Sequence, residues 1–125
     1  KLPNLEILDG DLHDKLLKCK LLILNAPNTT FNIAMSLNIP TISFWKPEDW
    51  GFDINSKKYF DSLSEFGVIY NNPIIASKKV NEIWNNVNDW WSCPNIQEAR
   101  KQWAGKYALK SNYWRKEWAK KIKNL

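Results

Sequence analysis

The chain has 125 residues, 44% of them hydrophobic and 25% charged, with a formal net charge of +5. This is enough for one globular domain with its own core and too little for two. The longest apolar run, at residues 21–24, is far shorter than the about 20 residues that cross a bilayer. Residues 1–11 are polar and no initiator Met is present, so we expect no signal peptide and a fragment of a larger protein.

The chain offers few residues for metal or nucleophile chemistry. Cys19 and Cys93 are the only cysteines and His13 is the only histidine. A zinc site needs about four ligands, and a Ser-His-Asp system needs a supported histidine. We therefore predict no metal, no cofactor and no disulfide framework, and a cytoplasmic location.

Hydrophobic patterns predict strands and helices that alternate through the first half. Residues 5–8 read as a short strand, and 11–19 as a helix that Asp11 caps. The apolar run at 21–24 predicts a strand buried on both faces. A buried helix follows at 29–37, and a second buried strand at 41–45.

The second half continues the alternation. A loop is expected at 46–55, a helix at 56–66 that ends before Gly67, and a strand at 68–70. An amphipathic helix covers 74–87 and a break 88–94. We therefore predict an α/β class, with a Rossmann-like parallel sheet of about four strands flanked by helices.

The last segment, 95–122, reads as one long helix with an aromatic stripe on one face. Residues 95–125 hold nine Lys and Arg against two Asp and Glu, whereas residues 1–94 hold nine against eleven. We expect the stripe to pack on the protein itself or on a missing N-terminal domain. The inner face of a membrane is the second choice of partner, and nucleic acid is the last and is not expected.

The turn after the first buried strand is the best candidate for chemistry. Asn25, Asn28, Thr29 and Thr30 lie where a parallel strand meets the next helix, and ligands bind there in open sheets. Free N–H groups and the helix dipole favour an anion such as a phosphate. Alternatively, Asn28 or Thr29 is an ordinary N-cap with no ligand.

A family resemblance bears on this choice. Residues 30–42, TFNIAMSLNIPTI, resemble the donor-binding segment of GT-B glycosyltransferases. The stretches YFDSL (59–63), GVI (67–69), WW (90–91) and QEAR (97–100) are similar to a bacterial family of predicted surface-polysaccharide transferases. The resemblance covers nearly the whole chain, as the C-terminal part of a larger protein.

The resemblance implies that Thr29 and Thr30 contact the phosphates of a nucleotide-sugar donor and that Asn25 and Asn28 line the same turn. It also implies a missing N-terminal acceptor domain. Two positions depart from the family pattern: Ile33 stands where a Glu often bonds the ribose, and Asn38 where Gly is usual.

The loop after the second buried strand is a further candidate. Trp45, Lys46 and Glu48 are expected at the same sheet edge as the threonines and would stack on a sugar or base and bond its hydroxyls. We favour a packed loop with Trp45 in the core and solvated charges.

From the sequence we thus expect residues 1–94 to form the donor-binding portion of one domain, and 95–125 a basic, Trp-rich helix packed on it. The expected function is nucleotide-sugar binding in a glycosyltransferase of bacterial surface polysaccharide synthesis. The competing expectation is a non-catalytic interaction module that binds a membrane or protein through the C-terminal helix.

Overall fold

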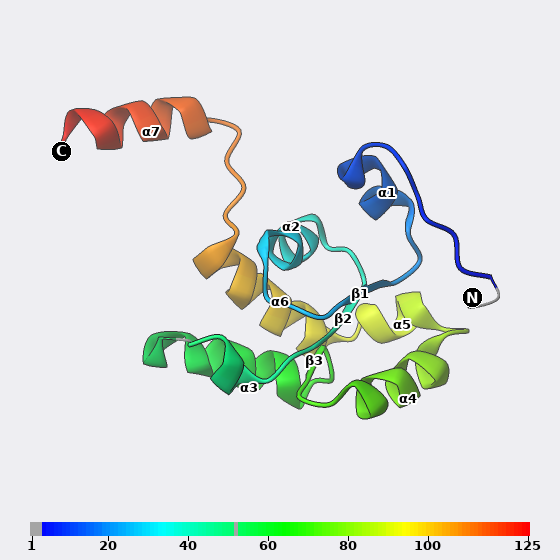
Figure 1. Cartoon of the computed structure of the whole chain (residues 1–125). Coiled ribbons are helices and arrows are strands. Elements are labelled where there is room, and N and C mark those ends of the chain that lie inside the picture. Colours follow the sequence, from blue (N-terminus) through cyan, green and yellow to red (C-terminus); the bar gives the residue numbers. More distant parts are fainter. Residues whose placement is uncertain (1–3, 52) are drawn as a thin grey trace.

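The computed structural model describes residues 4–51 and 53–125, which form a mixed α/β fold (Figure 1). Its sheet has three parallel strands in the order β1 (Leu22–Leu24), β2 (Thr41–Phe44) and β3 (Ile69–Tyr70). Because all three point the same way, their carboxyl ends share one edge. The predicted α/β class with a parallel sheet flanked by helices is confirmed.

The described residues also form seven α-helices and two short 3-10 turns. The helices are α1 (Leu12–Lys18), α2 (Thr29–Leu37), α3 (Lys57–Glu65), α4 (Pro73–Ile83), α5 (Val87–Trp91), α6 (Pro94–Tyr107) and α7 (Trp114–Lys123). The 3-10 turns, Pro47–Asp49 and Ile54–Ser56, lie in the predicted loop between β2 and α3.

The core has one hydrophobic cluster on each face of the sheet. On one face α2 and α3 pack against α6, and the fully buried Phe31 and Leu63 belong to this cluster. On the other face α4 packs over β2 and β3, with Ile42 at the centre. Side chains alternate along a strand, so Ile42 and Phe44 of β2 face this second cluster, whereas Trp45, the residue after β2, belongs to the first.

The predicted first strand is wrong, and the sheet has three strands rather than about four. Residues 5–8 form no strand, and Leu5, Ile7 and Leu8 are exposed. In the described part of the chain they have no neighbour to complete a hydrogen-bonded ladder. β1 is therefore an edge strand, and Ile23, predicted to be buried, is 50% exposed.

The sequence predicts a break between two helices at residues 88–94, but these residues are largely helical. Helix α5 begins at Val87, and both Val87 and Trp91 are buried. Their four-residue spacing places both on one side of a helix. The burial of these two side chains stabilises a short helix where the sequence predicts a break.

The predicted long C-terminal helix is two helices separated at residues 108–113. Ser111 competes with the helix locally, because its hydroxyl accepts from the N–H of Tyr113 at 3.0 Å and donates to Glu117 Oε1 at 2.9 Å. Trp103 in α6 is buried, as expected for a packed stripe. For Trp114 and Trp118 the prediction of packing is wrong within this chain, since α7 has no buried residue.

Candidate functional site

The turn at residues 25–28 joins the carboxyl end of β1 to α2. The buried Ser43 hydroxyl donates to the Leu24 carbonyl at 3.1 Å, which fixes the end of β1 against β2. Asn25 follows and is exposed, as is Asn28. The turn is thus anchored on its sheet side and open on its outer side.

Asn28 is the N-cap of α2. Its side-chain oxygen accepts from the N–H of Thr30 at 3.0 Å and of Phe31 at 3.3 Å. These contacts satisfy two of the free donors at the start of the helix. The capping role expected for Asn28 is therefore present, and its amide oxygen points back at its own helix.

The threonine hydroxyls are not used in this cap. Within the described residues, neither the hydroxyl of Thr29 nor that of Thr30 makes a hydrogen bond. Thr29 is exposed and Thr30 is partly buried. Two hydroxyls in the first helical turn are consequently free to bond another partner.

Helix α4 provides an internal comparison, because it starts at the same sheet edge after β3. Asn72 caps it as Asn28 caps α2, accepting from the N–H of Ile74 at 2.7 Å and of Ile75 at 3.4 Å. Its first turn reads Pro-Ile-Ile, with no hydroxyl. An Asn cap therefore suffices to start a helix here, and capping does not account for Thr29 and Thr30.

The second predicted group, in the loop after β2, is divided by the fold. Trp45 is only 5% exposed and meets the rings of Phe31 and Phe60 edge-on, at centroid distances of 5.2 Å and 6.0 Å. Its indole N–H is buried and has no partner among the described residues. Lys46 and Glu48 are exposed, so the structure does not bring them together with the ring of Trp45.

Glu48 instead lines a cavity of 420 Å³ between this loop and the start of α3. The side of the cavity formed by α3 carries Lys57, Phe60 and Asp61. Lys57 is bonded to Asp61 at 2.6 Å across one turn of the helix. The lysine is thereby already paired, whereas Glu48 and Asp53, which both line the cavity, form no ion pair in the described structure.

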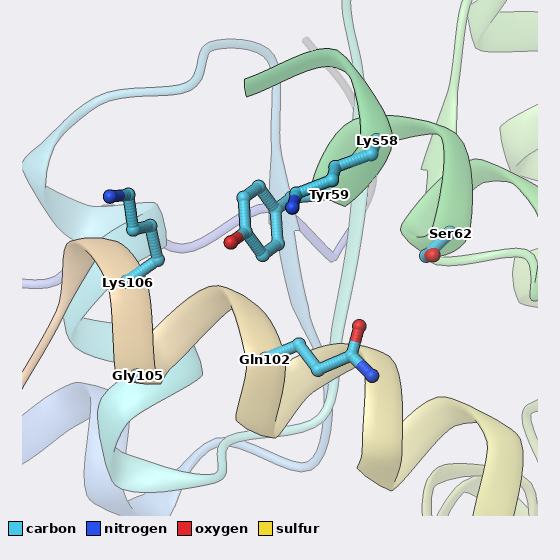
Figure 2. A pocket seen from close by; sticks show the side chains of 6 residues that line it. All are labelled: Lys58, Tyr59, Ser62, Gln102, Gly105 and Lys106. Atoms are coloured by element: carbon cyan, nitrogen blue, oxygen red, sulfur yellow. The ribbon is translucent and has the colours of Figure 1, made fainter. Parts of the chain in front are cut away.

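A larger cavity, of 590 Å³, lies between α3 and α6 (Figure 2). Tyr59 projects between the two helices, with Lys58 from α3 and Lys106 from α6 on either side of it. Gly105 adds no side chain to the floor. Sequence reasoning missed this cavity because its walls come from two distant helices, and the only local signal was a glycine within an amphipathic helix.

Two of the stretches that carried the family resemblance hold helices together. The indole N–H of Trp91 donates to Asn38 Oδ1 at 2.8 Å. Arg100 donates to the Met35 carbonyl at 2.8 Å and to Gln97 Oε1 at 3.1 Å. Burial lowers the pKa of Arg100 below its ordinary value, and the last turn of α2 offers the carbonyl that this cation needs.

The remaining pKa shifts lie away from the turn at residues 25–30. Burial raises the pKa of the Cys19 thiol. Burial, and secondarily the charge of Glu82, raises the pKa of Tyr70. Among the described residues no cluster of His, Cys, Asp and Glu could hold a metal ion, and no helix is long and apolar enough to span a bilayer.

The turn therefore presents two unengaged hydroxyls at the N-terminus of a helix, a position where the helix dipole favours negative charge. A family model described as LIC12162 family transferase matches residues 1–122 of the chain. No curated protein and no solved structure matches the chain.

Proposed function

This chain belongs to the LIC12162 family of transferases, and we propose that it is the donor-binding region of a glycosyltransferase that builds a bacterial surface polysaccharide. The observation that carries the proposal is the pair of unengaged hydroxyls on Thr29 and Thr30, in a helix that Asn28 already caps. The resemblance of residues 30–42 to GT-B donor segments supports the same assignment.

Thr29 and Thr30 would bond the diphosphate of a nucleotide sugar. The positive end of the α2 dipole favours negative charge at this position, and hydrogen bonds to charged oxygens are stronger than neutral ones. When the sugar is transferred, charge develops on the departing nucleotide. Groups already oriented toward that charge would stabilise it without reorganisation.

The ribose contact expected at the family's Glu position has no counterpart here. Ile33 is partly buried and packs against the main hydrophobic cluster. Its side chain stabilises α2 on the sheet and has no group to bond a hydroxyl. In the proposed complex, recognition therefore depends on the diphosphate, and the acceptor domain of the larger protein would complete the site.

The first test is calorimetric titration of the chain with UDP-glucose and GDP-mannose. Thr29→Val with Thr30→Val keeps the shape of both side chains and removes both hydroxyls. Each lost bond to a charged oxygen is worth about 1.5–3 kcal/mol, so affinity should fall at least tenfold. The free energy of unfolding should stay within about 0.5 kcal/mol, because the hydroxyls make no bond in the described structure.

The matched control is Ile74→Val with Ile75→Val, which changes the first turn of the other Asn-capped helix. It should leave affinity for both nucleotide sugars unchanged. The proposed role of the threonines is wrong if their replacement preserves affinity, or if the control loses as much.

A further inference from the structure

Helix α7 carries an apolar face that the chain leaves uncovered. Trp114, Trp118 and Ile122 are spaced by four residues and so lie on one face. They are 54%, 62% and 60% exposed. The helix extends away from the sheet and its flanking helices, beyond the linker at residues 108–113 (Figure 1).

The rest of α7 is strongly basic. It carries one carboxylate, Glu117, against five cations: Arg115, Lys116, Lys120, Lys121 and Lys123. None of the five forms an ion pair within the described residues. Arg115 lies 5.1 Å from the ring centre of Trp114, so the aromatic face and the charge adjoin each other.

The size of this face argues against a second protein as its occupant. A stable protein interface takes roughly 20–30 residues from each partner. Helix α7 has ten residues, of which three form the apolar face. A lipid surface requires no matching partner shape, because a short helix can lie in the interface with its apolar side in the headgroups.

The side-chain chemistry fits an anionic lipid surface. Tryptophan has an apolar body and one N–H donor, and it concentrates at the membrane–water boundary. Lysine and arginine are attracted to the negative surface of an anionic leaflet. We propose that α7 docks on an anionic phospholipid surface, with Trp114, Trp118 and Ile122 among the headgroups and the cations against lipid phosphates.

This inference is independent of the donor site. The linker at residues 108–113 separates α7 from Trp103, the last residue of α6 that is buried in the core. Docking would therefore place the domain near a bilayer without altering the turn at residues 25–30. The five cations also explain why the basic character of the chain is concentrated after residue 94.

Flotation of the 125-residue chain with vesicles tests the proposal. Vesicles of equal parts phosphatidylcholine and phosphatidylglycerol should bind the chain at low salt, and phosphatidylcholine alone should bind it at least tenfold more weakly. Trp114→Ala with Trp118→Ala should reduce anionic-vesicle binding at least tenfold. The matched control, Trp50→Ala with Trp84→Ala, removes two tryptophans that are 49% and 48% exposed on the body of the domain and should bind as the unmodified chain does.

Charge is tested separately. Lys120→Gln with Lys121→Gln should weaken binding and flatten its salt dependence, whereas Lys15→Gln with Lys18→Gln, on exposed positions of α1, should not. All these variants should fold, because α7 has no buried residue and the control positions are exposed.

Five results would overturn the proposal. The first two are that the chain does not float with anionic vesicles, or that it binds neutral vesicles equally well. The third is that the α7 variants and the control variants lose binding to the same extent. The fourth is that sedimentation shows a dimer, and that Trp114→Ala with Trp118→Ala dissociates it. This result would assign the apolar face to a second copy of the chain. The fifth is that binding that depends on α7 is found only with a single-stranded oligonucleotide.

Discussion

At the scale of single residues, Asn38 shows how a departure from the GT-B pattern that residues 30–42 resemble is accommodated. It ends α2 with φ of 58°, a left-handed conformation that glycine adopts freely and asparagine tolerates better than most residues. Its amide oxygen also receives the indole N–H of Trp91, which glycine could not offer. The asparagine thus combines the required backbone geometry with a tether to α5.

Replacement of Asn38 separates these two contributions. Asn38→Gly keeps the backbone geometry and loses the side-chain bond, which costs about 1 kcal/mol. Asn38→Ala loses the bond and adds the cost of a left-handed alanine, about 1 kcal/mol more. Urea unfolding should therefore show that the alanine variant is less stable than the glycine variant. Equal stability of the two variants would contradict this account of the helix end.

Residue-scale prediction from the sequence was accurate where the cause is local. The cap at Asp11 and the turn at Gly67, with φ of 77°, follow from the chemistry of those residues alone. The favoured burial of Trp45 is confirmed as well, although its cause is not local, because Phe31 and Phe60 close around the ring from two helices. A lone aromatic residue at a strand end fits both core packing and ligand stacking.

At the scale of elements, α6 and α7 differ in what stabilises them. Trp103 in α6 meets the rings of Phe31 and Phe60 at 5.4 Å and 4.7 Å and donates its indole N–H to Asn32 at 3.0 Å. Helix α7 has no such contact with the core. One sequence pattern therefore produced a packed helix and an exposed helix.

Truncation distinguishes the two. Deletion of residues 109–125 should change the free energy of unfolding by less than about 1 kcal/mol, because no buried side chain is lost. Trp103→Ala should cost about 3–5 kcal/mol, as expected when a buried aromatic side chain is removed. Thermal unfolding followed by circular dichroism measures both. A truncation as costly as the Trp103 variant would mean that α7 packs on the domain.

Periodicity identified most of these elements, and it failed where tertiary contacts decide. It predicted α2 at residues 29–37 and placed β2 and α3 to within about a residue. It missed the break at Ser111, because apolar spacing continues across it. It also placed a strand at residues 5–8, although a strand requires a neighbour and the described chain provides none there.

At the scale of the whole molecule, the candidate site depends on the sheet edge. Residue order alone placed Asn25, Asn28, Thr29 and Thr30 there, because parallel strands end at one edge. It could not show that Asn28 completes the cap by itself, nor that a second helix capped by Asn72 lacks hydroxyls. That comparison required the geometry of both helix starts. It is the reason for separating the cap from the proposed ligand contacts.

The most direct test of donor binding is a titration of the isotope-labelled chain with UDP-glucose, followed by amide correlation spectra. The account predicts that the largest shifts occur at Thr29 and Thr30, and that amides beside the cavity between α3 and α6 and in α7 stay in place. Shifts concentrated at Lys58 and Lys106, or no shifts at Thr29 and Thr30 at saturating donor, would contradict it.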